Sequence, residues 1–411
     1  MRVGRARSSQ GARDFTARTQ FTPRRWALAI AGSAALLLEV WVLPQGVPGK
    51  WVFVFLVVLF PICLFLIVLH EAGHLAAGRL VGFRFEFVDL GPLRIARAGQ
   101  RIRIRMLPKS SIPMAMAGCS PIDERNLRPR YAVFVAGGPI ANLLAGAIAI
   151  LLFLRWGCQW QVWSAPTSGQ LWLSASLIEV ASLSLLMFMG NLIPSTYGGY
   201  PSDGEQLRAL LGGGSGAERQ CAIASLQGRT EEGVRPRDWP LHLVERAEGG
   251  AADGTLFDIY GKVLGYYWAL DRGDLTGAEQ LLHLALASCD RHPKSSRFLV
   301  SLEATYFIAR HRGDAASAWA SLQRATLGVG PVFSVHVAER AMAAIYLARG
   351  DIDKARQWAS KGLEAIRRAP CTGIEFAEAD WLQEILGLCD TALNLPASEV
   401  ALQSDPQSPP R

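Results

Sequence analysis

Residues 51–74 read WVFVFLVVLFPICLFLIVLHEAGH, and this stretch decides how the chain can fold. Its apolar part, which ends at Leu69, is long enough to cross a lipid bilayer as a helix. On that helix His70 and His74 lie one turn apart on one face, so both imidazoles reach one metal ion, with Glu71 beside them. Such side chains at the end of a membrane span are costly to bury and are typical of functional sites. The spacing therefore predicts a catalytic metal site on a membrane helix.

Apolar segments in the first half of the chain predict four membrane spans. They are Trp26 to Leu43, Trp51 to about Leu80, Tyr131 to Leu154, and Leu171 to about Ile193. Arginines are concentrated in the N-terminal tail and in the loop after the second span, and basic residues mark the cytoplasmic side. We therefore expect the N-terminus and the C-terminal half to be cytoplasmic. We expect the first span to be retained, because no small-residue cleavage site follows it.

The charge and the cysteines exclude other classes of protein. The chain has 411 residues and a formal net charge of +7 at pH 7. Most of the excess positive charge flanks the spans, where it anchors them to the lipid bilayer. No nucleic-acid motif accompanies it, so we expect no nucleic-acid partner. The 7 cysteines form no C-x-x-C pair, which predicts reduced thiols and no cysteine metal site.

A catalytic zinc site needs a third protein ligand besides the two histidines. The best candidate is Asp203, which follows the fourth span and Asn191-Leu192-Ile193-Pro194. Pro-Ser-Asp-Gly is also good turn chemistry, so the alternative is a simple turn residue. The predicted topology favours a ligand, because it brings Asp203 to the same side of the membrane as His70 and His74.

These motifs together resemble the site-2 protease family of intramembrane zinc metallopeptidases over about Trp51 to Leu210. The segment Gly137-Gly138-Pro139-Ile140-Ala141-Asn142 is similar to that family's Gly-Pro-x-x-Asn segment. The resemblance implies the following roles: Zn²⁺ ligands His70, His74 and Asp203; general base Glu71; and Asn142 and Asn191 near the substrate backbone. Asn142 has an alternative role in close helix packing. The sequence departs from the family pattern at STYGGYP, residues 195–201, which delays the aspartate.

Two further features of the membrane half have open interpretations. The alternation from Phe83 to Met106 predicts strands, and the family carries a small β-element near the membrane. We hypothesise that an edge strand there pairs with unwound substrate, in which case Ile104→Pro impairs cleavage. Glu179, within the fourth span, is either a functional carboxylate, or a residue that simply lies near the outer interface or pairs with Arg155.

The C-terminal half carries a weak internal repeat, Gly-Asp-x-x-x-Ala, beginning at Gly273, Gly313 and Gly350. The pattern predicts helix-turn-helix repeats that resemble tetratricopeptide repeats, with a generic helical bundle as the alternative. Such arrays bind proteins, so we expect a protein partner there.

The predicted fold class is an α-helical polytopic membrane protein with a small β-element and an all-α cytoplasmic repeat domain. The predicted parts are a basic cytoplasmic tail (1–25), a membrane peptidase domain (26–211), a linker (212–255), a helical-repeat domain (256–393) and a disordered tail (394–411). The predicted function is an intramembrane zinc endopeptidase of a bacterial inner membrane that cleaves membrane proteins or peptides. Alternatives are a non-catalytic scaffold with a vestigial or structural metal site, and a metal transporter.

Overall fold

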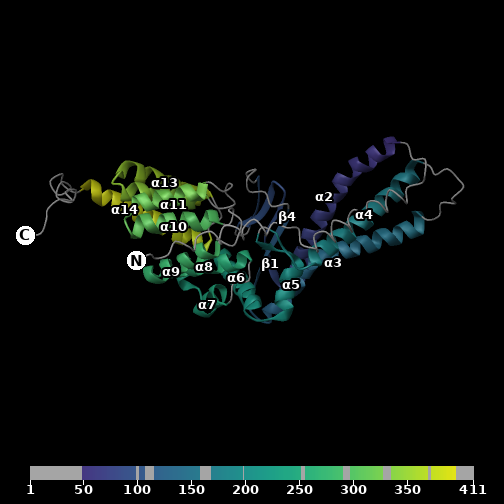
Figure 1. Cartoon of the computed structure of the whole chain (residues 1–411), viewed down its shortest axis with the longest axis horizontal. Coiled ribbons are helices and arrows are strands. Elements are labelled where there is room, and N and C mark those ends of the chain that lie inside the picture. The colour runs from purple at the N-terminus through teal and green to yellow at the C-terminus, as the bar shows by residue number, and fades with distance from the viewer. Residues whose placement is uncertain are drawn as a thin grey trace, which may run out of the picture. The chain divides into compact units, whose positions relative to one another are not determined.

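The structure, a computed structural model, describes residues 49–98, 101–106, 115–157, 168–197, 199–250, 255–289, 297–326, 335–368 and 372–394. The predicted basic tail and first span lie outside these residues, as does nearly all of the predicted disordered tail. The chain divides into two compact units, Met1–Leu66 with Asn142–Gly190 and Ile67–Ala141 with Asn191–Arg411. Figure 1 shows the order of the elements along the chain.

Three described helices are long and apolar enough to cross a membrane. Their bounds are α2 (Gly49–Leu80), α3 (Leu127–Leu152) and α4 (Ser168–Leu192), and a short π-helix, η2 (Phe153–Gly157), prolongs α3. The candidate spans within them are Val58–Leu80, Leu127–Trp156 and Leu173–Leu192. They match the second, third and fourth predicted spans. The helix α2 includes Pro61 and continues through it without a break.

The first unit contains residues 49–66 of α2, 142–152 of α3 and 168–190 of α4. Small residues let α3 and α4 approach closely, since a Cβ on Gly146 would lie 3.2 Å from the Cβ of Ser184. Close backbone approach at small residues is a common way to pack helices in lipid. Glu179 is buried in this unit, with 1% of its surface exposed.

An antiparallel sheet of four strands belongs to the second unit. The strands are β1 (Phe83–Leu90), β2 (Leu93–Ala98), β3 (Arg101–Met106) and β4 (Ala115–Pro121), in the order β3-β2-β1-β4. The first three lie within the predicted Phe83 to Met106 element. β4 was not predicted from the sequence, and it pairs with β1 from Phe83↔Pro121 to Leu90↔Ala115.

Helices occupy much of the region that we expected to be a linker, residues 212–255. After α5 (Asp203–Gly212) come α6 (Ser215–Glu231), a 3-10 turn η3 (Pro236–Asp238) and α7 (Leu241–Glu248). Their apolar side chains form a buried cluster with Leu264 of the next helix. The segment is therefore packed structure over most of its described length.

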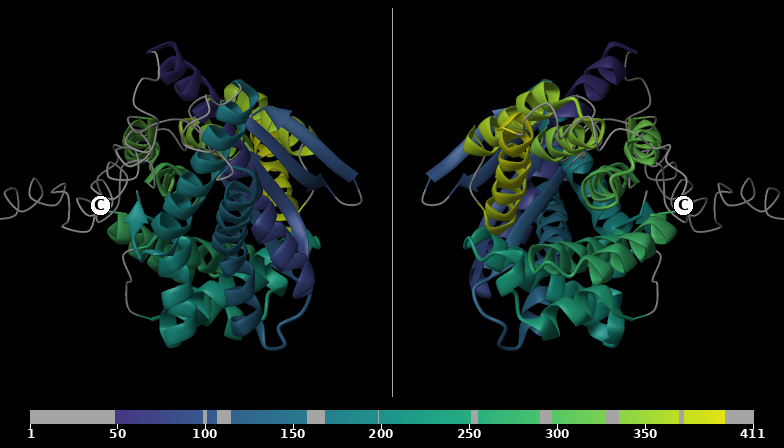
Figure 2. Two further views of the ribbon diagram at one scale, coloured as in Figure 1. Left: turned by 90° about the vertical axis from the view of Figure 1, so that its right-hand side faces the viewer. Right: turned by 90° about the vertical axis from the view of Figure 1, so that its left-hand side faces the viewer.

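Helices α8 to α14 form the rest of the second unit. Their bounds are α8 (Leu256–Asp271), α9 (Leu275–Cys289), α10 (Arg297–His311), α11 (Ala315–Thr326), α12 (Val335–Ala348), α13 (Ile352–Arg368) and α14 (Gly373–Asn394). α8 packs against α9, α10 against α11, and α12 against α13. Figure 2 shows these helices in green to yellow, packed side by side.

The three Gly-Asp pairs make equivalent turns between paired helices. Gly273, Gly313 and Gly350 have φ of +78°, +66° and +74°, a region that favours glycine. The following aspartate accepts a hydrogen bond from the backbone N–H three residues later, as in Asp314 Oδ1 with the N–H of Ser317 at 2.9 Å. The alanine of each motif is fully buried. The repeat in the sequence thus corresponds to a repeated helix-turn-helix.

A charged cluster lies in the core of these helices. Arg340 is fully buried, and its guanidinium lies 2.6 Å from Glu303 Oε2 and 2.9 Å from Glu378 Oε2. It also stacks over the Tyr306 ring at 4.0 Å. Because Glu303 is on α10, Arg340 on α12 and Glu378 on α14, the cluster joins three helices across the core.

Candidate metal centre

His70, His74 and Asp203 come together in the second unit, although 133 residues separate His70 from Asp203. The Nε2 atoms of the two histidines are 3.2 Å apart. Asp203 Oδ2 lies 3.1 Å from His70 Nε2 and 3.6 Å from His74 Nε2. Tetrahedral ligands about 2.0–2.1 Å from a zinc ion are separated from one another by about 3.3 Å. The three separations therefore fit one metal ion held by two nitrogens and one oxygen.

The ring of His74 is oriented by the neighbouring helix. Its Nδ1 lies 3.0 Å from the carbonyl oxygen of Phe134 on α3, so an Nδ1–H donates to that carbonyl. This tautomer leaves the Nε2 lone pair free to bind a metal. A metal-binding histidine commonly donates a hydrogen bond from its second ring nitrogen to a backbone carbonyl, which fixes the orientation of the ring.

Gly138 leaves open space beside both histidine side chains. A Cβ added at Gly138 would lie 2.4 Å from His74 Nε2 and 2.6 Å from His70 Nε2. These distances are longer than the bond of about 2.0–2.1 Å between zinc and an imidazole nitrogen, but too short for a carbon atom in van der Waals contact. The absent side chain at Gly138 thus leaves a small hollow against both ligand atoms.

Close contact between α2 and α3 makes this geometry possible. A Cβ on Gly73 would lie 2.4 Å from the carbonyl oxygen of Gly137, and one on Gly137 would lie 2.4 Å from the carbonyl oxygen of Gly73. The two backbones touch at these glycines, which brings α3 against the histidine face of α2.

Asp203 is the first residue of α5, and Ser202 caps that helix by accepting from the N–H of Glu205. Its side chain is 13% exposed. Burial acts to raise the pKa of the Asp203 carboxyl, but contacts with the His70 and His74 imidazoles hold that pKa below its usual value. The group is therefore an ionised carboxylate, as a metal ligand must be.

Glu71 is buried beside the three candidate ligands, with 7% of its surface exposed. It interacts electrostatically with His70, His74 and Asp203, and the backbone of Ala117 on β4 lies near its carboxylate. β4, a strand that the sequence did not predict, therefore lies beside Glu71.

The two predicted substrate-binding asparagines are on different helices. Asn142 is fully buried on α3, one turn after Gly138, and Asn191 is partly buried in the last turn of α4. Their contact with a substrate stays a prediction.

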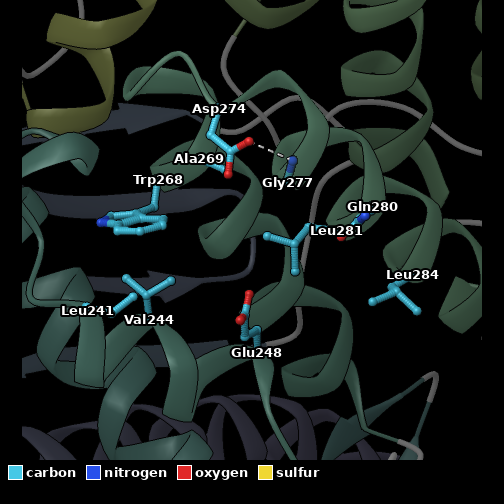
Figure 3. A pocket seen from close by; sticks show the side chains of 10 residues that line it. All are labelled: Leu241, Val244, Glu248, Trp268, Ala269, Asp274, Gly277, Gln280, Leu281 and Leu284. Atoms are coloured by element: carbon cyan, nitrogen blue, oxygen red, sulfur yellow. Dashed lines mark hydrogen bonds between the residues drawn. The ribbon is translucent and has the colours of Figure 1, made fainter.

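A pocket of about 330 Å³ lies elsewhere in the second unit, among α7, α8 and α9 (Figure 3). Its lining combines apolar side chains such as Leu281 with Trp268 and the carboxylates of Glu248 and Asp274. It contains no histidine, and the Asp274 carboxylate already accepts the N–H of Gly277 at 2.9 Å. Its composition gives it none of the chemistry predicted for the catalytic site.

Comparison with known proteins gives one match. The model of the family described as peptidase family M50 matches residues 58–348, which include both histidines, Glu71 and Asp203. The match continues beyond Leu210, where the resemblance of the sequence motifs ends, and includes α8 to α12. Comparisons with curated proteins and with solved structures give no match.

Proposed function

The chain belongs to peptidase family M50, a family of intramembrane metallopeptidases, and from this premise we propose that it is a zinc-dependent endopeptidase that cleaves membrane-embedded or membrane-associated proteins. The observation that carries the proposal is the convergence of His70, His74 and Asp203 at separations that fit one zinc ion. The family and the three apolar helices make the protein an integral membrane protein. We further propose a bacterial inner membrane with the C-terminal half in the cytoplasm, on the charge distribution described above.

In this proposal His70, His74 and Asp203 hold zinc. When bound, zinc supplies a Lewis acid that lowers the pKa of a water molecule to about 7 and stabilises an oxyanion. The Glu71 carboxylate takes the proton from the attacking water and delivers it to the amine of the leaving peptide. The carbonyl of Phe134 holds the His74 ring, and the backbone of Ala117 lies near the Glu71 carboxylate. Asn142 and Asn191 bind the substrate backbone.

The edge strand that pairs with substrate is β4 in this proposal, not β3. Both are edge strands of the described sheet, but β4 includes Ala117, whose backbone lies near the Glu71 carboxylate. Arg105 of β3 instead contacts the C-terminal helices, since its Nη2 donates to the carbonyl of Arg368 at the end of α13, 3.1 Å away. Ile104→Pro on β3 is accordingly expected to leave cleavage intact. Loss of cleavage with zinc retained would indicate that the substrate pairs with β3 and not with β4.

We also propose that α8 to α14 form a tetratricopeptide-like array that recruits a protein partner. The equivalent turns at Gly273, Gly313 and Gly350 support this assignment, because each starts a second helix in the same way. The partner would be tested by crosslinking in cells, where deletion of α10 to α14 is expected to remove a specific crosslinked species.

The test of the enzyme proposal separates binding from catalysis. The purified full-length chain is incubated in detergent with a mixture of single-span membrane proteins, and new N-termini are identified by mass spectrometry. We expect cleavage by the wild type, loss of cleavage with zinc retained in Glu71→Gln, and loss of both in Asp203→Asn. Zinc bound equally well by Asp203→Asn would contradict the ligand set. Zinc-loaded wild type without cleavage of any protein would favour the scaffold.

A further inference from the structure

The hairpin between α4 and Asp203 connects the candidate metal site to the C-terminal helices. Its strands are β5 (Thr196–Tyr197) and β6 (Tyr200–Pro201), paired as Thr196↔Pro201 and Tyr197↔Tyr200. This hairpin is the stretch STYGGYP, at which the sequence departs from the spacing of the site-2 protease motif. It ends immediately before Ser202 and Asp203.

Ser202 fixes the base of the hairpin to both flanking helices. Its Oγ donates to the carbonyl of Ile193 at 2.9 Å and accepts from the N–H of Glu205 at 3.2 Å. Its backbone N–H donates to the carbonyl of Ser195 at 2.8 Å, and the N–H of Ser195 donates back to Oγ at 3.1 Å. One side chain thus joins the end of α4, the hairpin and the first turn of α5, on which Asp203 lies.

The end of α4 and the start of α5 are in close contact at the same point. A Cβ on Gly204 would lie 1.8 Å from the carbonyl oxygen of Leu192. Only glycine fits there, so the backbone on either side of Asp203 is held by packing as well as by Ser202.

The tip of the hairpin is attached to the first helix of the C-terminal array. Gly199 is buried, has φ of +86°, and its carbonyl accepts a hydrogen bond from the N–H of Leu256 at 2.9 Å. Leu256 is the first residue of α8, where backbone N–H groups have no partner within the helix. The hairpin carbonyl therefore satisfies a group that α8 itself leaves unpaired.

The start of α8 is itself firmly held. Asp258, in the first turn, is 1% exposed and lies 3.5 Å from the fully buried Arg219 of α6. The opposite side of α8 contributes Val263, Tyr266 and Tyr267 to the core of the C-terminal helices. A contact with this helix therefore gives the hairpin a rigid support.

We propose that Ser202 and Gly199 are positioning residues for Asp203, and that the N–H of Leu256 makes metal affinity depend on the C-terminal helical array. The inference rests on the proposed function, because it assigns to Asp203 the role of third zinc ligand. The proposal gives the C-terminal helices a role in the active site besides partner binding. Displacement of α8 would loosen the hairpin, and Asp203 would then bind zinc more weakly.

The test uses a matched pair at Leu256 in the full-length chain. Leu256→Pro removes the N–H, and proline is well tolerated at the first position of a helix. Leu256→Ala removes the side chain and keeps the N–H. Zinc affinity is measured by competition with a chelator, and the ligand set by the visible spectrum of the Co²⁺-loaded protein. We expect affinity about five-fold lower for Leu256→Pro than for Leu256→Ala, the effect of one hydrogen bond.

A second pair tests the base of the hairpin independently. Ser202→Ala is expected to lower zinc affinity about ten-fold and to shift the Co²⁺ spectrum, whereas Ser202→Thr keeps the hydroxyl and restores both. Ser195→Ala is the control, because only the backbone of Ser195 takes part in the network.

Equal zinc affinity for the two Leu256 variants would overturn the role of α8, and wild-type affinity in Ser202→Ala would overturn the role of the hairpin base. A wild-type chain that binds no zinc would instead overturn the proposed function. For that case hydrogen exchange of the amides in 199–206 is compared between Leu256→Pro and Leu256→Ala in the metal-free chain. Faster exchange in the proline variant supports the proposal that the Leu256 N–H stabilises the hairpin, and equal exchange refutes it.

Discussion

Replacement of Gly138 by alanine is expected to abolish zinc binding while the fold survives. The new Cβ would lie 2.4 Å and 2.6 Å from the Nε2 atoms of His74 and His70, closer than real Cβ contacts come. Ordinary van der Waals separation is about 3.5 Å, so each ligand atom must move by about 1 Å. The methyl group would also occupy the space of the ion, because zinc binds imidazole nitrogen at about 2.0–2.1 Å.

The fold should tolerate this change because the clash is with the ends of two side chains, which can rotate away. Alanine is also favoured over glycine inside a helix by about 1 kcal/mol. Weakening a single supporting group around a metal reduces affinity about 10–100-fold, so displacement of two ligands should exceed 100-fold.

The assay is zinc content of the purified chain after dialysis against graded chelator. Gly190→Ala is the control, since a Cβ there meets nothing within 4 Å. Gly138→Ala that keeps zinc as tightly as Gly190→Ala, with an unchanged unfolding midpoint, would refute the placement of the ion between the two histidines.

Two further predictions concern the stability of the C-terminal helices, measured as the free energy of unfolding by denaturant in detergent. Arg340→Met leaves Glu303 and Glu378 buried without their cation and should lower stability by about 3–5 kcal/mol. Arg356→Met, which removes an exposed ion pair, should change stability by less than about 1 kcal/mol. Equal effects of the two substitutions would contradict the role of the buried cluster in the core. Burial and the nearby Arg340 lower the pKa of His336 to about 4, so between pH 6.5 and 4 the unfolded chain binds a proton that the folded chain does not. Stability should therefore fall by about 2 kcal/mol from pH 7 to pH 5 through this residue, and a His336→Gln variant with the same pH dependence as wild type would refute the assignment.

The sequence alone predicted the elements whose chemistry is local. His70, Glu71 and His74 follow from one helix, and the strands from Phe83 to Met106 follow from alternation. Asp203 followed only from combining a turn motif with membrane topology. The structure places it with the histidines because Ser202 and Gly204 hold α5 against the end of α4.

Other features could not be predicted because their signal is three-dimensional or weak. β4 is AMAGCSP, whose small residues show no alternation, and it is the backbone of Ala117 that lies near the Glu71 carboxylate. The contact between His74 and Phe134 uses a carbonyl that any residue supplies. Gly138 entered the sequence analysis only as part of the segment similar to Gly-Pro-x-x-Asn, and only the structure shows that it faces the Nε2 atoms of His70 and His74.

The expected linker, residues 212–255, begins with a glycine-rich stretch, but most of its described residues are helical. Gly213 and Gly214, with φ of +74° and +77°, form the sharp connection between α5 and α6. The following α6 buries Ala222, Ile223 and Leu226, which fix it in the core. Glycine composition predicts flexibility only where the flanking residues have nothing to pack against.

The central claim, that this chain cleaves membrane proteins with Glu71 as general base, is tested most directly in cells. Membrane and soluble proteomes are compared between cells that carry the intact chain and cells that carry Glu71→Gln, at matched expression and zinc content. We predict at least one membrane protein that is shortened with the intact chain and accumulates at full length with the variant. Identical proteomes across growth conditions, with both chains loaded with zinc, would contradict the claim.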